Sequence, residues 1–245
     1  MSVRIGREYR ISRAPLSIGT SEFRTARDNP VRMSVRDETV LIITADDYGY
    51  ARGYNRGILR AADAGAVDAV SAMVGRRWCE PEPLLDAGVE IGLHLELPGD
   101  DPLAQLERFE GVFGRPPAFL DGHNHCHAGA AAAGAIAGLA AERGMPVRSV
   151  DAAHRRLLRA LGVATPDRLI GRMDPSEPVL PSLLAQGSPP PPGVTEWMIH
   201  PGYPDPESGS SYDHAREEDL NLLLSVSSAI RRVRRQTHVE ALVAA

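Results

Sequence analysis

Short apolar runs alternate with longer amphipathic stretches along the chain from residue 38 onward. The apolar runs predict strands at 39–45, 67–74, 89–97, 118–123, 146–150 and 194–200. The amphipathic stretches predict helices at 53–65, 81–88, 101–114, 128–143 and 213–235. Strands that alternate with helices favour an α/β fold with a parallel sheet and crossover helices. About seven such units fit a (β/α) barrel or an open doubly wound sheet, and the pattern alone does not separate the two.

Acidic and histidine residues gather at the carboxyl ends of the predicted strands. Asp46 and Asp47 end the first strand, and His94 lies late in the third. His200 ends the last strand, four residues after Glu196. In both candidate folds, functional groups collect at this end of the strands. We therefore expect these side chains to meet at one rim of the sheet.

The stretch FLDGHNHCH at 119–127 places three histidines at alternate positions behind Asp121. Extended backbone points alternate side chains the same way, which would put His123, His125 and His127 on one side. Clustered imidazoles favour the neutral form, which is the form that binds metal ions. A solvated, histidine-rich loop explains the same residues, so this stretch by itself leaves both interpretations open.

Each polar residue also has a structural explanation when it is taken alone. Asp46 and Asp47 can cap the following helix. His94 can be a hydrogen-bonded core histidine, and His200 can simply end a strand. Their joint placement at several strand ends is what favours a metal site.

The chemistry of such a site follows from its donors. One carboxylate and two imidazoles leave open positions on a metal ion, as catalytic sites do. Neighbouring carboxylates on a strand point in different directions, so one can bind the ion while the other accepts a proton from the attacking water. A histidine across the pocket can protonate the leaving group. These parts suit hydrolysis of an amide or an ester.

Composition narrows the class of protein. The 245 residues carry a net charge of −5, with 43% hydrophobic and 24% charged residues, as ordinary globular proteins do. A net negative charge does not indicate the basic surface by which proteins bind nucleic acid. The longest apolar run, at 128–141, is too short to cross a bilayer, and the N-terminus lacks the apolar core of a signal peptide. We therefore expect a cytoplasmic protein with no nucleic-acid or membrane partner.

Several motifs together resemble, in order, those of the YdjC-like carbohydrate deacetylases. ADDYG at 45–49 is similar to the family's ADDFG start, and NRGI at 55–58 to its N-x-G-I helix. IGLHLEL, FLDGHNHCH and TEWMIHPGY resemble its later strands, and YDHAREEDL resembles a late pattern with a central arginine. The resemblance covers roughly residues 39–225 and implies an irregular (β/α) barrel of about seven strands, like that of polysaccharide deacetylases. Past residue 225 the match fades, so the closure of the barrel stays open.

The resemblance also implies a role for each matched residue. Asp47, His94 and His123 would hold the metal ion. Asp46 would be the general base and His200 the general acid. The implied domain spans 38–245, and the arginine-rich residues 1–37, which show no sustained periodicity, would form a poorly ordered N-terminal extension.

Four further residues are implied near the site, behind the metal ligands or against the substrate. Arg148 would orient the general base or bind the substrate. The other three are His125, His127 and Glu196.

The implied activity is removal of an acetyl group from an N-acetylated sugar, with release of acetate. One divalent metal ion is implied: the family favours Mg²⁺, whereas imidazole ligands favour Zn²⁺, and both stay open. The partner is the acetylated sugar, and the resemblance leaves a homodimer open. Two alternatives remain, a metal-dependent hydrolase of another amide or ester, and a sugar-binding relative without catalysis.

Overall fold

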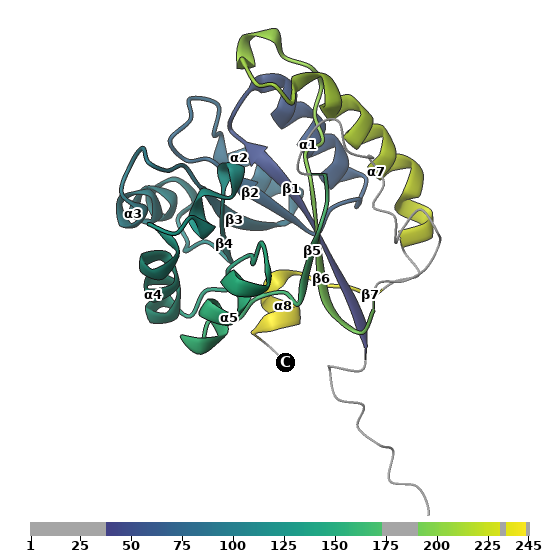
Figure 1. Ribbon diagram of the computed structural model, residues 1–245. Helices are drawn as coiled ribbons and strands as arrows, with labels where there is room; N and C mark the ends of the chain where they lie inside the picture. The colour runs from purple at the N-terminus through teal and green to yellow at the C-terminus, as the bar shows by residue number, and fades with distance from the viewer. Residues whose placement is uncertain (1–37, 173–190, 231–233, 244–245) are drawn as a thin grey trace, which may run out of the picture. The chain divides into compact units, whose positions relative to one another are not determined.

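Seven parallel strands form a single sheet that curls into a half-barrel (Figure 1). The structure is a computed structural model and describes residues 38–172, 191–230 and 234–243. The strands follow the order β4–β3–β2–β1–β6–β5. Strand β7 pairs with the start of β1, on the same edge on which β2 pairs with the end of β1. The strands are β1 (Thr39–Tyr48), β2 (Ala69–Ala72), β3 (Glu90–Leu95), β4 (Leu120–Gly122), β5 (Arg168–Ile170), β6 (Gly193–Ile199) and β7 (Arg234–Arg235). The predicted α/β fold with about seven strands is confirmed.

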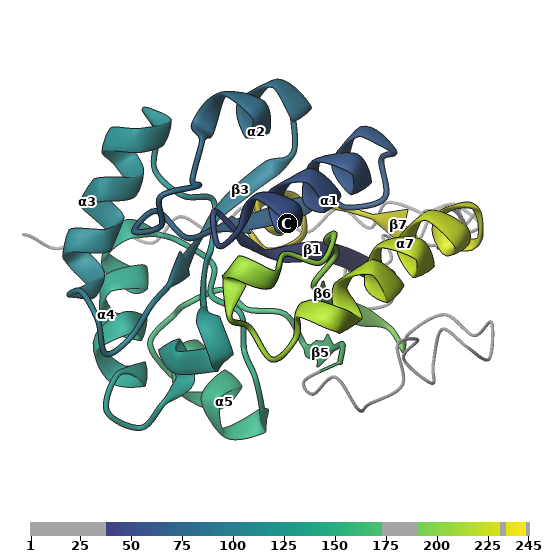
Figure 2. The same ribbon diagram turned by 90° about the horizontal axis from the view of Figure 1, so that it is seen from above.

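Helices cover the convex side of the half-barrel, with α1 and α7 side by side (Figures 1 and 2). They are α1 (Arg52–Asp63), α2 (Pro81–Ala87), α3 (Pro102–Phe113), α4 (Ala133–Arg143), α5 (Ala152–Ala160) and α7 (Arg216–Ile230). The short helix α8 (His238–Leu242) instead packs on the other face of the sheet, where Ala241 contacts Val40, Ile42 and Val194. None of the helices in the described ranges is long and apolar enough to cross a lipid bilayer.

The central strand β1 alternates its side chains between two buried environments. Leu41 and Ile43 pack into the main core beneath the helices, whereas Val40 and Ile42 belong to a smaller cluster on the other face. Alternation along a strand therefore places Asp46 on the same face as Val40 and Ile42, the concave face of the half-barrel. The same rule directs polar side chains of the neighbouring strands into this interior.

A β-bulge separates the two carboxylates at the end of β1. The register with β2 shifts between Ala45 and Tyr48, and Asp47 has a φ of 73°. A left-handed conformation is tolerated by aspartate more readily than by most residues and clusters at functional sites. The bulge turns Asp47 away from the direction of Asp46, as the sequence predicted for neighbouring carboxylates.

The histidine stretch differs from the prediction of an extended chain. Strand β4 ends at Gly122, and His123–Ala128 form a 3-10 turn, η2. Asn124 and His125 have φ of 50° and 56° inside it. The alternate-position rule fails because the chain turns back on itself, with Gly122 packed so closely that a Cβ would lie 2.8 Å from Cys126 Sγ. The three histidines therefore do not share one side.

The predicted strand at 146–150 is wrong. Its backbone is divided between two neighbours: Val147 N donates to Ala164 O, and Arg148 N donates to Leu120 O. Only a single bridge, between Leu120 and Val147, forms there. Pro146 lacks the N–H that a regular ladder needs. The sequence reading missed β5 and α5, which follow this segment.

The predicted helix at 213–235 is wrong at both of its ends. Asp213–Ala215 form a separate 3-10 turn, η4, and α7 spans Arg216–Ile230. Arg234 and Arg235 form β7, which pairs with Val40 and Leu41 of β1. The predicted extension at 1–37 lies outside the described residues, so it stays a prediction.

The backbone of helix α1 packs directly against the backbone of the loop after β6. A Cβ on Gly57 would lie 2.4 Å from the Cα of Gly202, so this position has room for glycine alone. The contact fixes the loop that follows His200. By contrast, a Cβ on Gly111, which is exposed on α3, would meet nothing within 4 Å.

We expect Gly57→Ala to lower the free energy of unfolding by about 1–3 kcal/mol, because backbone cannot yield as a side chain can. Gly111→Ala should raise it by roughly 0.5–1 kcal/mol, since alanine is the better helix former. Urea unfolding followed by circular dichroism measures both. Equal stabilities of the two variants would contradict the close packing.

Candidate active site

An open cleft of about 490 Å³ lies at the C-terminal ends of β1, β3, β4 and β6. Its walls come from strand ends, from the turn η2 and from the segment that precedes α7. The lining includes Asp46, Asp47, Tyr50, His94, His123, His125, Met198, His200, Tyr212 and Arg216. The expectation that polar strand-end residues meet at one rim is confirmed for Asp46, Asp47, His94 and His200, whereas Glu196 does not line the cleft.

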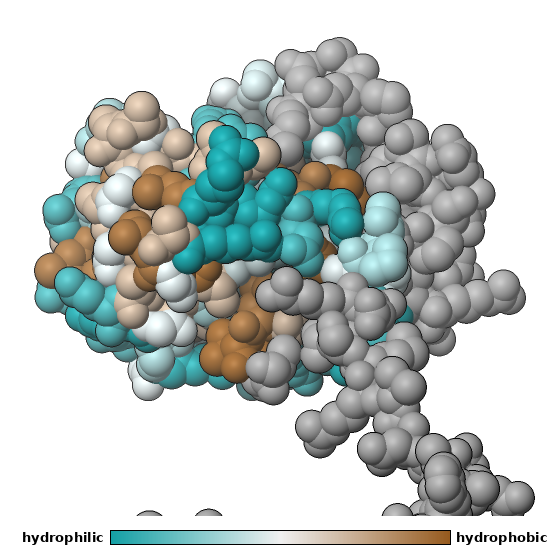
Figure 3. Space-filling view, turned by 60° about the horizontal axis from the view of Figure 1, so that its bottom comes forward, coloured by the Kyte–Doolittle hydropathy of each residue, from teal (hydrophilic) through white to brown (hydrophobic). Residues whose placement is uncertain are grey.

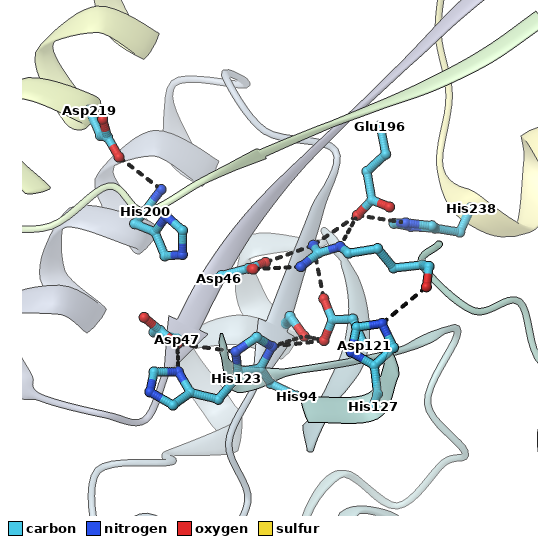
Figure 4. A network of polar contacts seen from close by, with 12 residues as sticks. Asp46, Asp47, His94, Asp121, His123, His127, Glu196, His200, Asp219 and His238 are labelled. Atoms are coloured by element: carbon cyan, nitrogen blue, oxygen red, sulfur yellow. Dashed lines mark hydrogen bonds and ion pairs between the residues drawn. The ribbon is translucent and has the colours of Figure 1, made fainter. Parts of the chain in front are cut away.

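Three predicted residues converge at the floor of this cleft (Figure 4). Asp47 Oδ1 lies 3.1 Å from His94 Nε2 and 2.9 Å from His123 Nδ1. The donor atoms of Asp47, His94 and His123 all lie within 4.8 Å of one another. Donors that each lie about 2.1 Å from one ion are about 3–3.5 Å apart, so one carboxylate and two imidazoles with this spacing fit a divalent cation.

His94 is oriented from behind by two polar side chains. Its Nδ1 lies 2.8 Å from Asp121 Oδ1 and 3.1 Å from Ser71 Oγ, so Nε2 is the nitrogen that faces the cleft. Ser71 also donates to Asp121 Oδ1. Burial alone would lower the pKa of His94, but Asp121 and Asp47 raise it well above its ordinary value. A carboxylate behind an imidazole is the usual support of a metal-binding histidine.

Asp46 is held by a buried arginine. Arg148 Nη1 and Nη2 donate to the two carboxylate oxygens of Asp46 at 2.6 and 2.8 Å. Arg148 Nη2 also lies 2.9 Å from Asp121 Oδ2, and its Nε donates to Glu196 Oε1 at 2.9 Å. Burial raises the pKa of Asp46 to about 6, although Arg148 opposes the rise. Glu196 thus lies behind Arg148 and is not among the residues that line the cleft.

Asp47 also pairs with an arginine, besides its contacts with the two histidines. Arg216 Nη2 donates to Asp47 Oδ2 at 2.5 Å, and the guanidinium lies over the ring of Tyr54 at 3.5 Å. Burial by itself raises the pKa of Asp47, but Arg216 and the hydrogen bonds from His123 and His94 hold it well below the ordinary value. Asp47 is therefore ionised, which suits a metal ligand.

His200 reaches the cleft from the end of β6. Its backbone N–H donates to Asp219 Oδ2 at 3.1 Å, and its ring packs against Tyr212 with centroids 4.7 Å apart. Its Nδ1 is buried and has no hydrogen-bond partner. Burial lowers the pKa of His200 to about 3, so the imidazole is neutral at pH 7.

The two remaining histidines of the turn, His125 and His127, lie in different environments. His125 lines the cleft, and burial lowers its pKa to about 4. His127 is buried, with Nε2 3.0 Å from the carbonyl oxygen of Arg148, and burial lowers its pKa to about 3. His127 is not among the residues that line the cleft, so it lies near the site without facing it.

The sequence-based prediction assigned no role to several residues of this site. Asp121 was visible in the histidine motif, and Arg216 was visible in YDHAREEDL, yet neither the pairing with His94 nor that with Asp47 follows from spacing. Asp47 and Arg216 are 169 positions apart. Ser71 and Tyr50 carried no sequence signal.

Comparison with known proteins agrees with these motifs. The family model of the YdjC-like protein matches residues 40–104 and 102–232. The chitooligosaccharide deacetylase of Serratia marcescens is 27% identical, over 76% of this chain and 91% of that protein. The chitooligosaccharide deacetylase of Yersinia pestis is 29% identical, and the match covers 45% of this chain and 59% of that protein.

Two crystal structures share the fold. One is a protein from Enterococcus faecalis provisionally named a cellobiose-phosphate cleavage protein, with a TM-score of 0.69 and 21% identity over 84% of this chain and all of that one. The other is an uncharacterised protein from Agrobacterium tumefaciens, with a TM-score of 0.51 and 14% identity over 85% of this chain and 90% of that one. With the family model matching most of its length, the chain belongs to the YdjC-like protein family.

Proposed function

We propose that this protein is a metal-dependent hydrolase that removes acetyl groups from N-acetylated sugars or oligosaccharides and releases acetate. The observation that carries the proposal is the convergence of Asp47, His94 and His123, with Asp46 beside them, in one open cleft. The relatives named chitooligosaccharide deacetylase support the sugar as substrate. We propose the cytoplasm as its location, and a homodimer stays a prediction.

Asp47, His94 and His123 would hold the ion through Oδ1, Nε2 and Nδ1. A bound divalent cation supplies a Lewis acid that polarises the acetyl carbonyl and acidifies water. The family resemblance favours Mg²⁺ and the two imidazoles favour Zn²⁺. The hydroxyl groups of Ser210 and Ser211 on the cleft wall suit a sugar, because they can donate and accept hydrogen bonds.

Asp46 is suited to be the general base. Its pKa of about 6 keeps it ionised at neutral pH and still basic enough to accept a proton from the attacking water. Arg148 fixes its orientation through both oxygens. His200 lines the cleft as the candidate general acid. Because its pKa of about 3 leaves the imidazole neutral at pH 7, it would first have to take up the proton that the attacking water loses to Asp46 and then pass that proton to the leaving amine.

Asp46→Asn should lower the kcat of acetate release from N-acetylglucosamine oligomers by about 10²–10⁴-fold, the range expected for loss of a general base. Calorimetric titration should show metal affinity close to that of the wild type. Asp63→Asn, at an exposed position of α1, is the matched control and should retain full activity. If the wild type, with metal bound, releases no acetate from any acetylated sugar, the proposed function is wrong.

Loss of a ligand should show directly in metal binding. His94→Ala and His123→Ala should each weaken binding of Zn²⁺ or Mn²⁺ to the metal-stripped protein by more than about 100-fold, and Asp121→Asn by about 10–100-fold, since it only supports His94. Isothermal titration calorimetry measures the affinities. His214→Ala, at an exposed position, should leave them unchanged. Wild-type affinity in the two ligand variants would place the ion elsewhere.

A further inference from the structure

The C-terminal segment from Arg234 to Leu242 lies at the end of the half-barrel opposite the cleft (Figure 1). Strand β7 pairs with the start of β1, and Ala241 of α8 packs against Val40, Ile42 and Val194. Figure 3 looks at this lower end, where a band of hydrophilic residues crosses between smaller hydrophobic areas. The family model ends at residue 232, so the segment lies beyond the part of the chain that the family defines.

His238 is the residue of this segment that enters the interior. Its Nδ1 and its backbone N–H each lie 2.8 Å from Glu90 Oε2, and its ring stacks on Phe119 with centroids 3.8 Å apart. These contacts fix the plane of the imidazole and direct Nε2 toward Glu196 Oε1, at 3.4 Å. Burial opposes protonation, but Glu196 and Glu90 raise the pKa of His238 to about 9. His238 is therefore a buried cation at neutral pH.

The charge of His238 reaches the candidate site through two further residues (Figure 4). Glu196 Oε1 lies between His238 Nε2 and Arg148 Nη2, the latter at 2.8 Å. Arg148 in turn grips both oxygens of Asp46. Charges thus alternate from His238 through Glu196 and Arg148 to Asp46. With a neutral side chain at position 238, Arg148 would be the main partner of Glu196 and would be drawn away from Asp46.

We propose that His238 is a positioning residue, which holds Glu196 in place so that the guanidinium of Arg148 donates to both carboxylate oxygens of Asp46. The effect on catalysis rests on the proposed function, whereas the effect on Arg148 does not. The competing explanation is that α8 only stabilises the sheet. Leu242→Ala separates the two, because Leu242 belongs to α8 and packs against the small cluster of Val40, Ile42 and Val194, whereas the contact with Glu196 is made by His238.

The test is the NMR signal of the Arg148 Nε–H in ¹⁵N-labelled protein, identified by its loss in Arg148→Lys. This N–H donates to Glu196, so it reports on the pairing whether or not the protein is active. His238→Gln should move the signal by several linewidths, and Leu242→Ala should leave it in place. Glu90→Gln, which removes the carboxylate that orients His238 but keeps the ring, should move it in the same direction and serves if His238→Gln does not fold.

Steady-state kinetics completes the test. His238→Gln should lower kcat at least about tenfold with KM nearly unchanged, since a shift of ~1 Å in a catalytic group can cost 10²-fold. Leu242→Ala should keep the wild-type kcat. An Arg148 signal that stays in place, or a wild-type kcat in His238→Gln, overturns the proposal. If the wild type releases no acetate, the proposed function fails, and the NMR signal still decides whether His238 holds Arg148.

Discussion

Arg148 is buried among the carboxylates of Asp46, Asp121 and Glu196, and the polar interior of the half-barrel depends on these ion pairs. An ion taken out of water costs several kcal/mol unless its partners are close and well oriented. Asp46 and Glu196 lie on strands that pair directly with each other, and Asp121 lies on the strand beside that of His94. Any loss of one partner leaves an uncompensated charge, so the arrangement tolerates little movement.

Basic side chains complete the network on its outer sides. His94 lies against Asp121 and Asp47, Arg216 pairs with Asp47, and His238 faces Glu196. The network thus runs from α8, at one end of the half-barrel, to the open cleft at the other. Burial raises the pKa of Asp46 although Arg148 opposes the rise, whereas Arg216, His123 and His94 outweigh burial at Asp47 and lower its pKa, so two adjacent carboxylates have opposite pKa shifts. Such a pair is suited to one basic and one metal-binding role.

Hydrophobic periodicity predicted most of the sheet, because buried parallel strands such as β1 are continuous apolar runs. It failed where tertiary contacts decide the backbone, as in η2, whose tight turn rests on the packing of Gly122. It also failed at β5, whose three residues, RLI, are too few to show a periodicity. Residues of the site that lie at strand ends or within the ordered motifs could be predicted from the sequence, and these include Asp47, His94 and His123. The pairing of Asp47 with Arg216 and that of Glu196 with His238 join residues distant in sequence, so spacing could not reveal them.

The proposed chemistry requires that Asp47, His94 and His123 together hold one cation in the cleft. Anomalous diffraction from crystals of the protein with Mn²⁺ or Zn²⁺ tests it most directly. A single strong peak should lie about 2.0–2.2 Å from Asp47 Oδ1, His94 Nε2 and His123 Nδ1. A peak at another group of residues, or imidazoles of His94 and His123 that turn away from the bound ion, would contradict it.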